Sequence, residues 1–201
     1  MRPGTKILGI GAHCDDLELN ALGTLLSWRN EYDAEIHRII CTNSGDINND
    51  RNEIEQATVD STMGYHTIST LNNPDGNLKL DDVLIFNIEQ ICNTIQPDIV
   101  ITHTEQDFHQ DHVAVAKAVK AVNRYSKFSV LSFPSQDPKQ PFLANLHVDI
   151  TPYMETKLRL LKFYKSQQGK PWLDENIIKS RNAGIGGMQW SEKFNVQYLK
   201  V

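Results

Sequence analysis

The sequence has few cysteines, no long apolar run and no excess of basic residues. Its three cysteines, Cys14, Cys41 and Cys92, lie far apart and form no CxxC pair, which argues against a disulfide framework and a structural zinc knuckle. No apolar segment approaches the roughly 20 residues that a membrane-spanning helix requires, so we expect no membrane insertion. The net charge is −5. Without a basic field, nucleic acid is not an expected partner.

The length of 201 residues suits one domain, and we expect residues 1–201 to form it. The N-terminal segment reaches Asp15 before an apolar h-region has formed, so it reads as a first strand rather than a secretory signal. We therefore expect a cytoplasmic protein. Nothing in the sequence indicates its oligomeric state.

Short apolar runs alternate with longer segments of helical periodicity up to about residue 150, which is typical of βαβ units. We predict an α/β fold: a single Rossmann-like domain with a mostly parallel sheet flanked by helices. The expected strands are 6–12, 35–42, 66–71, 98–103, 128–133 and 143–150. The expected helices lie around 19–26 and at 81–95, 113–122 and 151–165, with loops at 42–52 and 181–190.

The first expected strand ends in Ala-His-Cys-Asp-Asp-Leu-Glu, residues 12–18, at its junction with a helix. Such junctions expose side chains at the carboxyl edge of a sheet. His13 and Asp16 are close enough to reach one ion at about 2.0–2.2 Å from each. His112, after the fourth strand, joins them if that strand lies beside the first. Two imidazoles and a carboxylate with an open position are typical of hydrolytic zinc, and Fe²⁺ would accept the same set.

Further acid–base groups accompany these candidate ligands. Asp15 is the candidate general base, although it could act only as a helix cap. His109 precedes His112 by one helical turn and is the candidate donor to an oxyanion. Asp107 and Asp111 are expected to orient a histidine from outside the metal shell.

The two segments resemble the motifs of the PIG-L/LmbE deacetylase family. Its opening motif, Ala-His-Pro-Asp-Asp-x-Glu, is met by residues 12–18 except for Cys14, and its second motif, Asp-x-His-x-Asp-His, by residues 107–112. The resemblance implies a Rossmann-like domain and hydrolysis of N-acetylglucosamine-type conjugates. It also implies zinc on His13, Asp16 and His112, with Asp15 as base. It does not fix the group attached to the sugar, and the role of Cys14 in place of proline stays open.

The expected partner is a small N-acetyl amino sugar conjugate. Arg51, which could equally be a solvated surface residue, and Arg181 are candidate substrate contacts. Trp172 and Trp190 could stack on a sugar ring or pack in the core. Polar loops at 42–52, 72–77 and 166–187 are expected to select the group attached to the sugar. Structural roles are expected for four other histidines, His37, His66, His103 and His147.

Two other functions fit the same residues. One is a metal-dependent amidohydrolase or esterase that acts on a non-sugar substrate. The other is a catalytically idle sugar-binding module, which the intact Asp15 disfavours, because a module that only binds needs no base.

Overall fold

A seven-stranded sheet with the strand order β3-β2-β1-β4-β5-β7-β6 forms the centre of the molecule. The computed structural model describes residues 1–43, 51–136 and 139–199, with the backbone alone for 51–54 and 56. The first five strands are parallel, and β7 pairs antiparallel with both β5 and β6. The strands are β1 (Lys6–Gly11), β2 (Glu35–Thr42), β3 (Thr67–Asn73), β4 (Ile99–His103), β5 (Ser129–Phe133), β6 (Leu146–Asp149) and β7 (Ser191–Tyr198).

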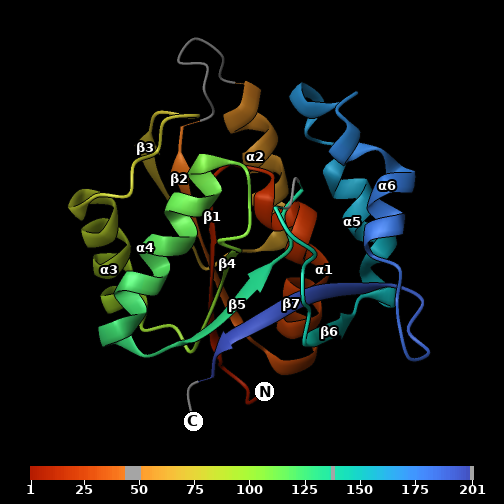
Figure 1. Cartoon of the computed structure of the whole chain (residues 1–201). Coiled ribbons are helices and arrows are strands. Elements are labelled where there is room, and N and C mark those ends of the chain that lie inside the picture. The colour runs from red at the N-terminus through yellow and green to blue at the C-terminus, as the bar shows by residue number, and fades with distance from the viewer. Residues whose placement is uncertain (44–50, 137–138, 200–201) are drawn as a thin grey trace.

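Helices cover both faces of the sheet (Figure 1). One face packs against α1 (Asp16–Tyr32), α2 (Arg51–Met63), α5 (Met154–Leu161) and α6 (Glu175–Arg181), which bury Leu22, Val59, Leu158 and Ile178 in one core cluster. The other face packs against α3 (Asp82–Ile95) and α4 (Gln110–Ser126), which bury Ile88 and Val119 in a second cluster. Three short 3₁₀ turns complete the elements: η1 (Thr151–Tyr153), η2 (Lys165–Gln167) and η3 (Pro171–Leu173).

The chain order creates a switch point between β1 and β4. From β1 the chain runs outward through β2 to β3, then returns past β1 to place β4 on its other side. The predicted neighbourhood of the first and fourth strands is thus confirmed. In open α/β sheets of this kind, ligands bind at the carboxyl ends of the strands that flank the switch point.

The predicted fold class is confirmed, with differences in the C-terminal third. The helix expected at 151–165 is shorter: η1 precedes α5, which ends at Leu161. The antiparallel strand β7 was not expected, because Glu192 and Lys193 interrupt the apolar alternation at its start. The helix α2 was also not expected, because its sequence is mostly polar and, among the apolar side chains that the structure describes there, it buries only Val59 and Met63.

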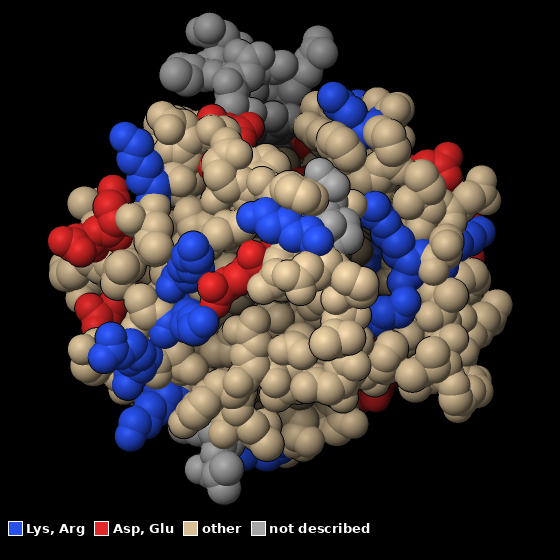
Figure 2. All heavy atoms as spheres, viewed as in Figure 1, with Lys and Arg blue, Asp and Glu red and all other residues tan. Residues whose placement is uncertain are grey.

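Among the helices of the described residues, none is long and apolar enough to cross a membrane. On the face shown in Figure 2, several basic side chains lie close together on the left of the view, over α4, with acidic side chains beside them.

Candidate metal and catalytic site

A cavity of about 940 Å³ opens at the carboxyl edge of the sheet, beside the switch point. The segment after β1 contributes His13 and Asp16, and the start of α4 contributes His109 and His112. Asp75 enters from the loop between β3 and α3. Two segments almost a hundred residues apart therefore meet at one site.

The segment after β1 is tightly folded. The His13 backbone N–H donates to Asp16 Oδ2 at 2.6 Å, and the Thr42 N–H donates to the Ala12 carbonyl at 3.0 Å. A Cβ at Gly11 would lie 3.1 Å from the His13 carbonyl oxygen and 3.2 Å from Asp16 Cβ. Glycine at this position thus lets the segment turn back over the end of β1, and His13 and Asp16 then face the same space.

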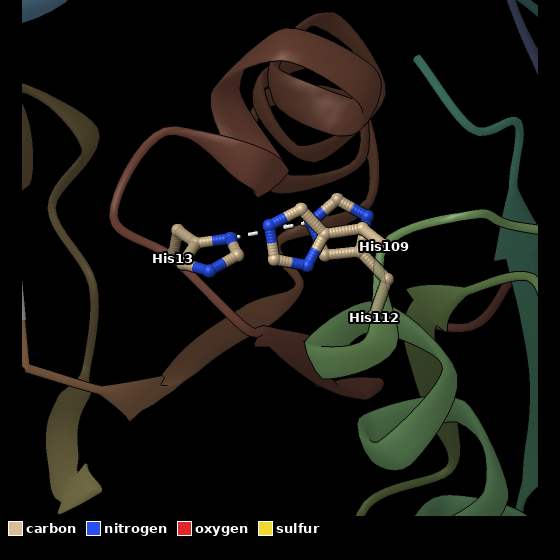
Figure 3. A group of neighbouring side chains, drawn as sticks. All are labelled: His13, His109 and His112. Atoms are coloured by element: carbon tan, nitrogen blue, oxygen red, sulfur yellow. Dashed lines mark hydrogen bonds between the residues drawn. The ribbon is translucent and has the colours of Figure 1, made fainter. Parts of the chain in front are cut away.

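Four side-chain atoms of three residues converge in that space. His13 Nδ1 lies 3.2 Å from His112 Nε2 and 3.5 Å from Asp16 Oδ2, and His112 Nε2 lies 3.5 Å from Asp16 Oδ1. Figure 3 shows the two imidazoles approaching each other from the loop after β1 and from α4. Ligands at about 2.0–2.2 Å from a tetrahedral ion stand about 3.3–3.6 Å apart. The spacing of these atoms suits one small divalent cation.

Outer hydrogen bonds direct the ring nitrogens. His112 Nδ1 lies 2.7 Å from Asp107 Oδ2, and His13 Nε2 lies 3.0 Å from Asp75 Oδ1 and 3.3 Å from Asp111 Oδ2. Each carboxylate accepts the proton of the ring nitrogen that it faces, so the other nitrogen keeps its lone pair. The two remaining nitrogens therefore face each other at 3.2 Å, where they can share either a proton or a metal ion.

The charges of the site also favour a bound metal ion. Burial alone would lower the pKa of His13, but the carboxylates of Asp16 and Asp75 raise it to about 11. Burial would likewise raise the pKa of Asp16, but His103, His112 and His13 hold it well below its usual range. A divalent cation would replace the proton that His13 holds at neutral pH and would balance more of the negative charge, so the donor set fits a metal ion.

Three overlapping groups of side chains have the spacing of a metal site within the part of the chain that the structure describes. They are His13 with His109 and His112, Asp16 with His103 and His112, and His13 with Asp75 and Asp111. Cys14 belongs to none of the three groups. The structure thus supports a metal site here. The predicted set of His13, Asp16 and His112 takes its members from these groups but is not itself one of the three.

Asp15 lies beside these groups with its carboxylate uncommitted to the helix. It occupies the N-cap position of α1, but its side chain makes no capping hydrogen bond. It is 8% exposed and lines the cavity. Burial and the neighbouring Asp16 raise the pKa of its carboxyl to about 7, with His13 opposing. A carboxylate of this basicity can exchange a proton near neutral pH.

His109 stacks on His112, with ring centroids 4.4 Å apart. Its Nδ1 accepts a hydrogen bond from the Asp111 N–H at 3.3 Å, so the ring caps α4 and its proton resides on Nε2. Burial lowers the pKa of His109, and the nearby His112 and His13 lower it further. His109 is therefore a neutral ring with one N–H to donate.

The two expected orienting aspartates have distinct contacts. Asp107 accepts from the His109 N–H at 2.8 Å as well as facing His112. Asp111 is fully buried and accepts from the backbone N–H groups of Gly76 and Leu78 at 2.7 and 2.9 Å. Asp111 thereby holds the β3–α3 loop, and with it Asp75, against the start of α4.

Two residues at the site were not predicted to take part in it. His103 Nε2 accepts from the Ala12 N–H at 3.0 Å, lies 3.1 Å from Asp16 Oδ2, and its ring stacks 4.0 Å from that of His112. The position of His103 at the end of β4 is the feature of the sequence that could have indicated its place in the site. Asp75 lies in the polar loop 72–77, and its sequence neighbours do not distinguish it from a surface aspartate.

The candidate substrate contacts lie farther from the cluster. Arg181 and Trp172 line the same cavity, and Arg181 Nη2 donates to the Gln136 carbonyl at 3.2 Å. Trp190 is partly buried and packs against the core cluster that contains Leu22. Arg51 is the first residue of α2, but its side chain lies outside the described part of the structure.

The chain belongs to the PIG-L family. The model of that family, described as GlcNAc-PI de-N-acetylase, matches residues 8–123. The chain is also 30% identical over 169 residues to the uncharacterized deacetylase YaiS of Escherichia coli, a match that covers 80% of this chain and 90% of the relative. The predicted family and the predicted class of enzyme, a deacetylase, are confirmed.

Solved structures show the same fold. The conserved protein TT1542 from Thermus thermophilus superposes with a TM-score of 0.83 at 22% identity, covering 97% of this chain and 95% of that one. The N,N'-diacetylchitobiose deacetylase from Pyrococcus horikoshii superposes with a TM-score of 0.81 at 19% identity, covering 96% and 84%. At these identities the likeness concerns the fold.

Proposed function

We propose that this protein is a zinc-dependent hydrolase that removes the acetyl group from an N-acetyl amino sugar conjugate. The observation that carries the proposal is the convergence of His13 Nδ1, His112 Nε2 and the Asp16 carboxylate at 3.2–3.5 Å from one another. These three residues would hold the ion. Fe²⁺ suits the same ligands, and metal analysis decides between the two ions.

Zinc bound here would polarise the amide carbonyl and lower the pKa of water from about 15.7 to about 7. Asp15 then accepts the proton from the attacking water and returns it to the amide nitrogen as the C–N bond breaks, because an amine leaves poorly without a proton. Two products result, acetate and the free amino sugar. The raised pKa of Asp15 suits both halves of this transfer.

His109 would stabilise the negative charge that develops on the carbonyl oxygen. Its Nε2–H is free to donate because Nδ1 is committed to the Asp111 N–H. A fixed donor that need not reorient during the reaction is an effective form of such stabilisation. Asp107 and Asp111 would keep the two metal-binding imidazoles in their tautomers.

The sugar substrate is supported by the family description and by the sugar deacetylase among the similar structures. An N-acetyl amino sugar has both an amide and hydroxyl groups, which the polar side chains in the wall of the cavity, such as Asp15 and His109, can bind. Arg181 and, at the start of α2, Arg51 are proposed to contact this substrate. A cytoplasmic location and a single domain remain predictions.

Paired variants test the assignment of base and ligand. Asp15→Asn should lower kcat by at least about 100-fold with its zinc content unchanged, because it removes proton transfer but no ligand. His112→Ala should lose the metal itself. Asp149→Asn and His147→Ala, the same changes on β6, are the controls. Full activity in Asp15→Asn would contradict the mechanism.

A substrate assay tests the reaction class. Acetate release from N-acetylglucosamine glycosides should be abolished by a chelator and restored by zinc. Release that a chelator does not affect would point to another active site. Turnover of simple non-sugar amides or esters, with none of the glycosides, would favour the alternative of a non-sugar amidohydrolase or esterase.

A further inference from the structure

The loop between β1 and α1, residues 12–15, carries both a candidate metal ligand, His13, and the candidate base, Asp15 (Figure 3). In the family's motif the position between these two residues is proline, and in this chain it is Cys14. A proline ring fixes φ at about −65°. A cysteine leaves that dihedral free to rotate, so another contact must hold the backbone between ligand and base.

The two ends of this loop are held by the sheet and by the helix. The Ala12 N–H donates to His103 Nε2 at 3.0 Å, and the Ala12 carbonyl accepts from Thr42 Oγ1 at 2.7 Å. At the other end, the Asp15 carbonyl accepts from the Leu19 N–H at 2.9 Å, as the first bond of the α1 ladder. These contacts leave the middle of the loop, the peptide that joins residues 14 and 15, to be fixed by something else.

A tyrosine from the opposite end of the chain contacts that peptide. The hydroxyl of Tyr164 donates to the Cys14 carbonyl at 2.9 Å. Within the described residues, no backbone N–H donates to the same carbonyl. Because this carbonyl belongs to the peptide between Cys14 and Asp15, the hydrogen bond fixes the plane of that peptide. It therefore sets the direction in which the Asp15 side chain leaves the backbone.

Tyr164 is itself firmly placed. Its side chain is fully buried in the core cluster that contains Leu158, and Cys14 packs against the same cluster. The backbone carbonyl of Tyr164 accepts from the Gln167 N–H at 3.0 Å and from Gln168 Nε2 at 3.2 Å. A hydroxyl on a ring packed in this way is a donor at a fixed position.

The backbone at Cys14 would also accept a proline. Its φ is negative, as a proline requires. Its N–H, which a proline would lack, donates to no other backbone group in the part of the chain that the structure describes. A proline at position 14 and the hydroxyl of Tyr164 are thus two separate ways of restraining the same short stretch of backbone.

Building on the proposed function, we propose that Tyr164 is the positioning residue of this loop, whose hydroxyl does for Cys14 what the ring does for a proline. Without this hydrogen bond, His13 and Asp15 would spend part of the time outside the arrangement that binds zinc. Apparent affinity falls with the fraction of protein that is competent to bind. One hydrogen bond of ordinary strength corresponds to a loss of about fivefold to tenfold.

A double-mutant cycle on zinc affinity, measured by competition against a chromophoric chelator, tests this proposal. Tyr164→Phe keeps the ring and should raise the Kd for zinc about fivefold to tenfold. Cys14→Pro alone should change the Kd less than about twofold, because Tyr164 already holds the loop, but combined with Tyr164→Phe it should restore the original Kd. Tyr153→Phe, which removes a hydroxyl 3.5 Å from Glu31 on η1, is the control and should leave the Kd unchanged.

Acetate release gives a second measurement on the same variants. At saturating zinc, Tyr164→Phe should lower kcat about fivefold to tenfold with KM unchanged, because Asp15 is displaced and no substrate contact is lost. The combined variant should recover kcat. A general loss of core stability would lower the urea midpoint but would not be repaired at the metal by a proline in the loop.

A Kd in Tyr164→Phe equal to that of Tyr153→Phe would overturn the proposal. An affinity that Cys14→Pro fails to restore, or an equal effect of Cys14→Pro with and without the hydroxyl, would do the same. If Tyr164→Phe alone does not fold, it is made in Cys14→Pro protein, where a Kd raised more than about twofold would contradict the proposal. A protein that completes the zinc cycle as expected but releases no acetate keeps the positioning role and loses the proposed function.

Discussion

Replacing Asp107 by asparagine should weaken zinc binding, although Asp107 would not touch the metal. The carboxylate uses both oxygens as acceptors, Oδ1 for the His109 N–H at 2.8 Å and Oδ2 for His112 Nδ1 at 2.7 Å. An asparagine has one acceptor oxygen, so its NH₂ group must face one of these two donors. If the NH₂ group faces His112, Nδ1 loses its acceptor and the tautomer is no longer fixed. If it faces the His109 N–H, the side chain that holds His112 is displaced. Such outer partners are worth about 10- to 100-fold in metal affinity.

Competition against a chromophoric chelator measures the zinc affinity of Asp107→Asn. We expect a Kd raised by about 10- to 100-fold, which corresponds to about 1.4–2.7 kcal/mol. The control is Asp149→Asn at the end of β6, whose remaining side-chain oxygen can still accept from the Thr151 N–H, and it should leave the Kd unchanged. If Asp107→Asn bound zinc as tightly as that control, Asp107 would not orient His112.

Two further predictions concern stability, both measured by urea unfolding. Glu192→Gln should destabilise the protein by about 3–5 kcal/mol, because Lys157, fully buried 2.7 Å from Glu192, would lose its counter-charge. Glu175→Gln, at a surface pair with Lys179, is the control, and an equal loss there would refute the argument. Gly23→Ala should cost about 1–3 kcal/mol despite alanine's higher helix propensity, because its Cβ would lie 2.6 Å from Ile150 Cγ2; a stabilised variant would contradict this.

The convergence at the switch point could be predicted because it depends on simple rules. His13 and His112 both follow strands of a parallel sheet, and parallel strands present their carboxyl ends at one edge. Apolar periodicity located those strands to within one or two residues. The fold class and the convergence of the two motifs could therefore be predicted from the sequence alone.

The surroundings of the site could not be predicted in the same way. Asp75 reaches His13 only because Asp111 holds the β3–α3 loop through the Gly76 and Leu78 N–H groups. Gln136 acquires its orientation from a hydrogen bond to a residue 116 positions away. Such contacts are tertiary, and the local sequence around each residue has no periodicity or motif that indicates them.

One zinc ion should bind between His13, Asp16 and His112. Anomalous diffraction at the zinc edge, on crystals of the zinc-loaded protein, would locate this ion. We expect one strong peak at about 2.0–2.2 Å from His13 Nδ1, His112 Nε2 and an Asp16 oxygen. A peak held instead by His13, Asp75 and Asp111, or no peak in a folded protein supplied with zinc, would contradict it.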